Sequence, residues 1–302
     1  MSARIEVMSN RIIIPNEQVT THVDYMRMRL ISFSMLRMKS GWVQRMLSPF
    51  WRLYCNLDEG VEVLCEGRTF PLRARRVYLV PAWLLWSGRT KPGVRHIWTH
   101  FDLPGMTRSL SRTAFPLPIQ IYPRAVPEKT RAPIDLAGQF AEMGAAVSAT
   151  PSPDALLVCW AKSLTYWGMR EAFAQLSPEL RTRCLNTGTG HHPLMRVLNL
   201  IDMNLHQELS NAVLAEAVPC SRPHLPRLFR SLLGVSPARY VTERRVSRAA
   251  ELLLYGDESL DQVAELCGFP NRHYFTRVFT RVLGTPPARY RNAMLRSNTT
   301  GL

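Results

Sequence analysis

Arginine, histidine and threonine side chains recur in two short segments near the C-terminal end of the 302-residue chain. Arginine can bind phosphate or the edge of guanine through two parallel hydrogen bonds, and histidine or threonine can donate to bases or phosphates. This chemistry indicates contact with nucleic acid, and the alternatives are a solvated helix face or contacts with phosphate alone. The candidate residues are Arg222, His224 and Arg227 in the first segment, and Arg272, His273, Thr276 and Arg277 in the second.

The net charge of the chain has the sign that such a partner requires. Lysine and arginine total 38 against 23 acidic residues, which gives +15 and a pI of about 10.2. Only four residues are lysine, so 38 − 4 leaves 34 arginines, although a GC-rich genome would also raise that count. No apolar run approaches the roughly 18 residues of a membrane span. We therefore expect a polyanion, in the form of nucleic acid, and no membrane partner.

The N-terminal sequence and the cysteine pattern both indicate the same cellular compartment. The first nineteen residues contain only a three-residue apolar run, which is too short for a signal peptide. The six cysteines include no CxxC pair, which indicates reduced thiols rather than a disulfide framework. The sequence therefore predicts a cytoplasmic protein.

A repeated segment positions the candidate residues. RLFRSLLGVSPARY at 227–240 and RVFTRVLGTPPARY at 277–290 are identical at eight of fourteen positions. Each copy ends a pattern of two short amphipathic helices joined by a tight turn, and this pattern predicts a helix-turn-helix unit. The candidate residues then lie near the N-terminus of each second helix, which is the part that faces base edges. The predicted caps and stops are Ser210, Ser221, Ser259, Asn271, Gly234, Gly268 and Gly284.

One long helix is predicted between the copies, from Pro237 to Gly256. A rigid connector of this kind can hold two readers in successive major grooves, about 34 Å apart. One chain would then read a longer asymmetric site than a single unit could.

Residues 193–302 resemble the DNA-binding domain of the AraC/XylS family of bacterial transcription regulators. The matching stretches are LAEAV, CSRPHLPRLFRSLLGVSPARYV, RRVSRAAELLL and LDQVAELCGFPNRHYFTRVFTRVLGTPPARYR. The resemblance implies a sequence-specific transcription regulator, with RNA polymerase as a further partner and Arg245 in a structural role. It leaves open whether the protein is an activator or a repressor. Asn211 replaces an apolar residue of the family, and Pro226 lacks a backbone N–H inside the first recognition helix, so we expect the first reader to be distorted.

The N-terminal part has a different period. Short segments between Arg27 and about Leu103 alternate between apolar and polar residues, which predicts an antiparallel barrel or sandwich. Residues 1–125 resemble the cupin-like effector domain that is often fused to AraC-type readers. The resemblance implies a pocket for a small-molecule effector, such as a sugar or related metabolite. Aromatic walls suit such ligands, and the alternative is that most of these rings belong to the core. The candidates are Trp51, Tyr54, Trp83, Trp98 and His96.

A metal-dependent cupin enzyme tethered to DNA is the alternative from another functional class. Catalytic cupins hold a metal with an HxH pair, a glutamate and a later histidine, and the chain has no HxH. His96 and His100 stand on one predicted strand without a nearby acid, and His191–His192 lack a second cysteine beside Cys184. We therefore expect no enzyme, no metal and no cofactor.

Two segments, one helical and one flexible, are predicted to connect the β-domain to the helix-turn-helix domain. Residues 126–176 are predicted to form helices that either pair two subunits into a homodimer, as the resemblance implies, or pack against the chain's own barrel. Residues 177–192 are rich in polar residues, glycine and threonine, which predicts a flexible linker. The fold class that follows is α+β, with an N-terminal antiparallel barrel or sandwich and a C-terminal all-α domain of two helix-turn-helix units.

Overall fold

The computed structural model describes residues 28–39, 43–122, 135–150, 153–186, 193–216 and 224–298. Ser221, Arg222 and the pair His191–His192 lie outside these ranges, as does the rest of the predicted linker from residue 187 to 190. No helix in the described ranges is long and apolar enough to cross a membrane.

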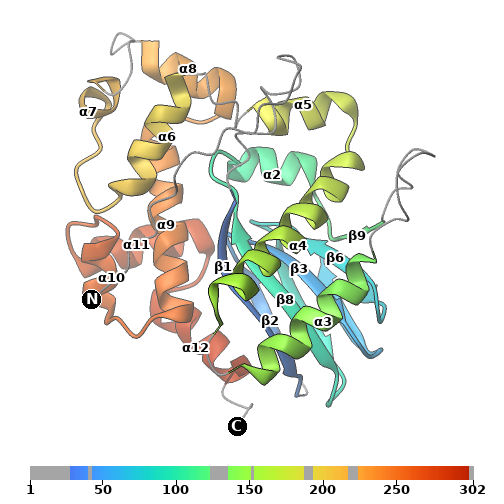
Figure 1. The fold of residues 1–302 in the computed structure, drawn as a ribbon. Coiled ribbons are helices and arrows are strands. Elements are labelled where there is room, and N and C mark those ends of the chain that lie inside the picture. Colours follow the sequence, from blue (N-terminus) through green and yellow to red (C-terminus); the bar gives the residue numbers. More distant parts are fainter. Residues whose placement is uncertain are drawn as a thin grey trace.

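The N-terminal half consists of two antiparallel sheets, as predicted (Figure 1). The strand order of the larger sheet is β1 (Arg29–Arg37), β8 (Arg95–Asp102), β3 (Trp51–Asn56), β6 (Val77–Val80) and β9 (Ile119–Ile121). The smaller sheet contains β2 (Val43–Leu47), β7 (Leu85–Thr90), β4 (Val61–Cys65) and β5 (Arg68–Leu72). Strand β9 lies beyond the range from Arg27 to about Leu103 in which strands were predicted, and β2 and β7 have the least regular patterns within it. They lack a long apolar alternation, and pairing with their neighbours defines them.

Helices α3 (Leu136–Ala149) and α4 (Ala155–Ala174) lie across the outer face of the larger sheet (Figure 1). Asp135 and Asp154 cap them by accepting hydrogen bonds from backbone N–H groups. The approach is close, because a Cβ on Gly168 would stand 2.5 Å from the Leu53 side chain and one on Gly144 would stand 2.9 Å from Ile97. These helices therefore pack closely against the chain's own sheet, and their pairing with a second subunit stays a prediction.

The first part of the predicted flexible linker is helical. Helix α5 spans Pro178–Asn186, and the hydroxyl of Ser177 accepts a hydrogen bond from the Leu180 N–H at its start. The Arg181 side chain donates to the carbonyls of Phe173, Ala174 and Leu176 at the end of α4. These bonds satisfy carbonyls that a helix end leaves free, which explains why a polar sequence is ordered here.

The C-terminal half is all-α. It contains α6 (Pro193–Met203), α7 (Asn211–Glu216), α8 (His224–Leu233), α9 (Pro237–Tyr255), α10 (Leu260–Leu266), α11 (Arg272–Leu283) and α12 (Pro287–Asn298). Figure 1 shows α7 and α8 at one end of α9, and α10 and α11 at the other. Helix α9 has 19 residues, so its length is about 28 Å at 1.5 Å per residue. This confirms the predicted connector between two helix-turn-helix units.

The repeated sequence forms the same helix end twice, with a left-handed glycine followed by a tyrosine that packs on a phenylalanine. Gly234 and Gly284 both have φ of 70°, the left-handed conformation that ends a helix. The following tyrosine then folds back, so that Tyr240 meets Phe229 edge-on at 5.9 Å between ring centroids and Tyr290 meets Phe279 at 5.3 Å. Each unit therefore closes its own end with one aromatic pair.

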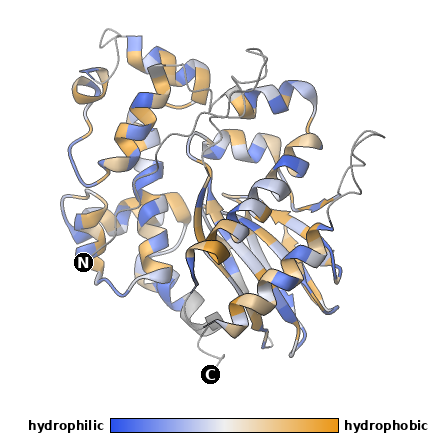
Figure 2. Ribbon diagram, in the orientation of Figure 1, coloured by the Kyte–Doolittle hydropathy of each residue, from blue (hydrophilic) through white to orange (hydrophobic). Residues whose placement is uncertain are grey.

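The apolar interior is divided unequally between the two units. The first unit has a core of its own, formed by α6, α7, α8 and the start of α9. The core of the second unit continues into the β-domain, so that Val246, Phe275 and Tyr290 belong to the same apolar cluster as Leu53 and Phe101. In Figure 2 the helices show mixed hydrophilic and hydrophobic residues, as expected for helices with one buried face.

Polar contacts also dock the helical half onto the β-domain. The two repeated tyrosines take part, because the Tyr240 hydroxyl accepts from the Gly105 N–H at 3.2 Å and the Tyr290 hydroxyl donates to Ser48 at 3.4 Å. Arg244 on α9 binds Asp102 at 2.7 Å and Asp202 at 2.6 Å. The two halves therefore meet along most of α9.

Candidate nucleic-acid interface

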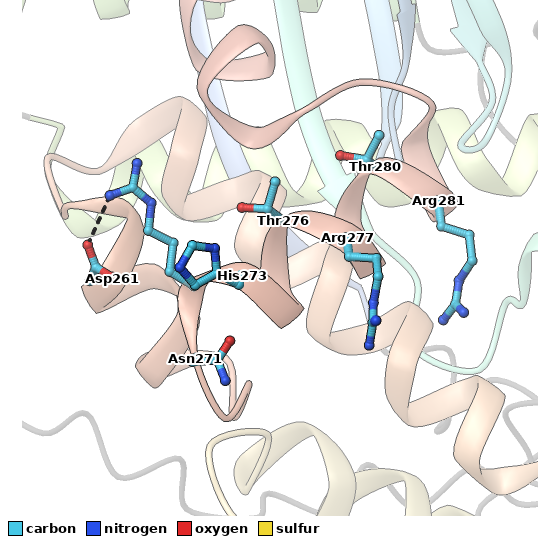
Figure 3. Close-up of a pocket in the computed structure, with 8 residues that line it drawn as sticks. Asp261, Asn271, His273, Thr276, Arg277, Thr280 and Arg281 are labelled. Carbon is cyan, nitrogen blue, oxygen red and sulfur yellow. Dashed lines mark hydrogen bonds and ion pairs between the residues drawn. The ribbon is translucent and has the colours of Figure 1, made fainter.

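An open groove of about 1090 Å³ lies along the exposed face of α11. Figure 3 shows the side chains that line it. The groove brings together all four residues predicted for the second reader, which are Arg272, His273, Thr276 and Arg277. It also includes residues that the prediction missed, namely Asp261, Asn271, Thr280 and Arg281. Thr280 and Arg281 lie one helical turn beyond Thr276 and Arg277, and this spacing alone was sufficient to find them.

Local sequence explains why this face is exposed. The Asn271 side chain accepts a 2.8 Å hydrogen bond from the Tyr274 N–H, which confirms the predicted cap and fixes where α11 begins. Phe275 and Phe279 are fully buried on the inner face, so Arg277, which lies between them, points outward. Tyr274, beside Phe275, is 41% exposed. The Arg277 guanidinium lies over its ring at 5.1 Å, which gives this tyrosine a surface role.

The turn that places α11 depends on Gly268 and Arg245. Gly268 has φ of 70°, and a Cβ there would meet the Leu205 carbonyl oxygen at 2.2 Å. Arg245 lies against the same glycine and donates to the carbonyls of Leu205 at 3.0 Å and Gln207 at 2.6 Å. This agrees with the predicted structural role of Arg245, which joins the chain before α7 to the turn of the second unit.

One acidic residue stands inside the basic groove. Asp261 on α10 forms an ion pair of 3.4 Å with Arg272, and both side chains are more than half exposed. A capping box between Ser259 and Gln262 fixes the start of α10, so the position of Asp261 is well defined. Arg272 is therefore held toward α10 before any partner binds.

The first unit presents fewer of its predicted residues. His224 and Arg227 are exposed on α8, while Arg222 lies outside the described residues. Leu225, Phe229 and Leu233 are buried on the opposite face. Pro226 is half-buried and is the third residue of a helix that is continuous from His224 to Leu233, so the distortion predicted from it does not appear in the described part of α8. Val213 on α7 is 39% exposed, because Leu214 and Ala215 occupy the contact with the core.

The residues predicted for an effector pocket lie on two different faces of the larger sheet. Tyr54, His96 and Trp98 share the face that looks toward the smaller sheet, with ring centroids 4.6 Å apart for Tyr54 and His96 and 5.7 Å for His96 and Trp98. Trp51 lies on the opposite face, against Phe115 under the helices. Trp83 is in a loop, where Arg108 covers its ring. The structure therefore groups three of the five candidates.

Burial sets the protonation of the grouped histidine. His96 accepts or donates a 2.7 Å hydrogen bond through Nδ1 to the Asn56 side chain. Burial lowers the pKa of His96 to about 3, so the ring is neutral at physiological pH. Within the described residues, no group of three or more histidine, cysteine, aspartate or glutamate side chains is arranged to hold a metal ion.

Comparison with known proteins gives matches of two kinds. Residues 214–293 match the family model described as a helix-turn-helix domain. The chain is 33% identical over 103 residues to the HTH-type transcriptional regulator YbfP of Bacillus subtilis, and 35% identical over 100 residues to the HTH-type transcriptional regulator GbdR of Pseudomonas aeruginosa. These alignments cover 34% and 33% of this chain, and only 35% and 27% of the relatives. They therefore concern the helical half.

A solved structure is similar over a longer range. ToxT from Vibrio cholerae, with a small molecule bound, aligns with 88% of this chain and 100% of its own at a TM-score of 0.52. The sequence identity is 10%, so the likeness is one of fold. It confirms the predicted order of an antiparallel β-domain followed by helix-turn-helix units.

Proposed function

We propose that the chain is a sequence-specific DNA-binding transcription regulator of the AraC type, controlled by a small-molecule effector, because residues 214–293 match the helix-turn-helix family model. The observation that carries the proposal is the groove on α11. Four predicted contact residues lie together on one exposed helix face, at the N-terminal end of the second helix of the unit. That is the part of a recognition helix that meets base edges in the major groove.

The length of the connector supports reading by both units. A helix of about 28 Å places the two units at a separation close to one turn of duplex, about 34 Å. Arginines on α11 and α8 would supply both phosphate and base contacts. RNA polymerase and a second copy of the chain are the further partners that we propose for such a regulator.

The effector would bind between the two sheets. Tyr54, His96 and Trp98 support this place, because they present rings and hydrogen-bonding groups on a face that the helices do not cover. ToxT, which shares the fold, is described with a small molecule bound.

Selection from a random duplex library, followed by salt titration of the selected site, tests the DNA-binding proposal. We expect a long asymmetric site, and an affinity whose logarithm falls with log salt by about 0.9 for each phosphate contacted. Arg277→Ala should weaken binding, and Arg68→Ala is a matched control because Arg68 is an exposed arginine on β5 of the β-domain. The DNA-binding proposal would be wrong if no sequence is enriched and if the affinity does not change with salt concentration.

A further inference from the structure

The inner face of the larger sheet is unusually polar. Strands β3 and β8 pair Arg52 with His100, Tyr54 with Trp98 and Asn56 with His96, and these pairs share one face. The opposite face of the same strands carries Leu53 and Phe101 and packs under the helices. A core formed for stability alone would be apolar on both faces, because buried polar groups are unfavourable unless they are paired.

Arg52 is the strongest departure from an apolar core. It is fully buried, and its Nη1 donates to the Phe50 carbonyl at 2.9 Å. Its Nε and Nη2 have no hydrogen-bond partner among the described residues. No carboxylate in the described ranges lies within salt-bridge distance of it. The guanidinium carbon is instead 5.4 Å from the ring centroids of both Phe50 and Trp86.

His100 adds a third buried nitrogen without a hydrogen-bond partner in the described residues, beside Arg52. Its Nδ1 is hydrogen-bonded to the Tyr255 hydroxyl, and its Nε2 is buried without a partner among the described residues. Burial, and then the charge of Arg52, hold the pKa of His100 well below its usual range, so the ring is neutral. A neutral ring that accepts from Tyr255 at Nδ1 carries its proton at Nε2.

We propose that Arg52 and His100 form the anion subsite of the effector pocket, and that the effector is a carboxylate attached to a flat apolar body. This inference rests on the proposed effector control. Arg52 Nε and Nη2 are donors, and so is His100 Nε2 in the tautomer that accepts from Tyr255, which suits an anion that only accepts. The Nε and Nη2 edge of a guanidinium matches the two oxygens of a carboxylate, and one positive charge matches one negative charge. The rings of Phe50, Tyr54, Trp86 and Trp98 surround the site and suit a flat body.

The same site reaches the DNA-binding half through Tyr255. This residue ends α9, the helix that joins the two readers. It is 43% exposed overall, but its hydroxyl enters the β-domain at His100. An anion on Nε2 fixes the His100 tautomer that accepts from Tyr255, and thereby strengthens the attachment of α9. Effector binding and DNA binding are then linked, and each must change the affinity of the other by the same factor.

The test uses the purified full chain with acetate, phenylacetate, 2-naphthylacetate, phenylacetamide and inorganic phosphate, measured by calorimetry and thermal shift. We expect at least one ring-bearing carboxylate to bind the wild type tenfold or more tightly than phenylacetamide, and Arg52→Met to abolish that preference. Without any probe, Arg52→Met should melt at the same temperature as the wild type or higher, because a buried unpaired charge is lost. Arg52→Lys keeps the charge but not the fork, and should bind the carboxylates more weakly than the wild type.

Three results would overturn the inference. They are equal binding of phenylacetate and phenylacetamide, tighter binding of phosphate than of every carboxylate, and a large loss of thermal stability in Arg52→Met. Tyr255→Phe should keep carboxylate binding within about threefold while the carboxylate no longer changes DNA affinity; a retained change would exclude the proposed coupling. DNA binding by the wild type without any probe tests the proposed function separately. If DNA binds and no carboxylate does, only the inference fails.

Discussion

At the scale of single residues, the most informative contact is the ion pair between Asp261 and Arg272, because an acidic side chain disfavours the binding of DNA at this surface. Asp261 places a negative charge in the groove on α11 and holds Arg272 by an exposed ion pair. Such a pair contributes little to stability, on the order of 0–1 kcal/mol. The ion pair matters more for DNA binding than for stability. Arg272 can contact a base only if it breaks the ion pair, or if Asp261 also moves toward the DNA.

We therefore expect Asp261→Asn to raise affinity for non-specific duplex several-fold at low salt, because a charge that repels phosphate is lost. The gain should shrink as salt increases. Glu265→Gln is the matched control, since Glu265 is an exposed acid on the same helix but has no ion pair with Arg272. Fluorescence anisotropy with an unrelated duplex measures both. Equal gains in the two variants would mean that the groove does not distinguish Asp261 from any other surface acid.

The buried histidines lead to a prediction on pH. Burial lowers the pKa of His96 to about 3, and burial together with the charge of Arg52 lowers that of His100 well below its ordinary value. The unfolded chain takes up these protons near pH 6.5 while the folded chain does not, so stability is complete above pH 6.5 and falls as pH drops toward the folded pKa. Between pH 6.5 and 5 each histidine should remove about 2 kcal/mol.

Chemical denaturation at pH 7, 6 and 5 measures this loss. His96→Gln should reduce the loss by about half. His273→Gln is the control, because His273 is exposed on α11, and its loss should equal that of the wild type. A wild-type free energy of unfolding that does not change over this range would contradict the assigned protonation.

At the scale of elements, the two readers differ in how many predicted contact residues they present. Helix α11 begins at an asparagine cap and presents four predicted contact residues in one groove. The first turn of α8 contains Pro226, whose missing N–H removes no helical hydrogen bond at that position. We predict that the second reader carries more of the sequence discrimination. Arg272→Ala or His273→Ala should relax preference at defined bases by about 1–3 kcal/mol. Arg222→Ala or His224→Ala should weaken binding more evenly across sequences.

Binding-site selection with each variant, scored base by base, decides between the readers. If the Arg222 and His224 variants lose preference at defined positions while the Arg272 and His273 variants keep it, the order is reversed. Pro226 would then aim the first helix at the bases.

The helix-turn-helix elements could be predicted from sequence because their determinants are local. Caps at Ser259 and Asn271, stops at Gly234 and Gly284 and the apolar spacing of α11 each depend on residues within one or two turns. The β-domain was predicted less completely, since β9 is defined by its partner β6 and not by its own pattern. The contact between His100 and Tyr255 joins residues 155 positions apart, and no local pattern contains it. The unused donors of Arg52 were hidden for the same reason.

At the scale of the whole molecule, a fragment that begins at His192 tests how independent the halves are. We expect it to fold and to bind DNA, because the first unit has its own core and the repeated aromatic pairs lie within the fragment. It should melt at a lower temperature than the full chain, because it loses Ser48 and Asp102 as partners of Tyr290 and Arg244. It should not respond to any carboxylate. A circular dichroism spectrum without helical signal would place the domain boundary elsewhere.

The continuity of the second unit's core with the β-domain also has a consequence for how the two copies can diverge. A substitution at Phe275 or Val278 must be compatible with the packing of its own unit and with the packing of the β-domain, because both share one apolar core. A substitution in the first unit meets only a local core. The first copy should therefore tolerate more change over generations, and both departures from the family pattern, Asn211 and Pro226, do fall in it. A change in the preferred DNA sequence would then arise first through substitutions in the first unit, while the second unit keeps its original sequence preference.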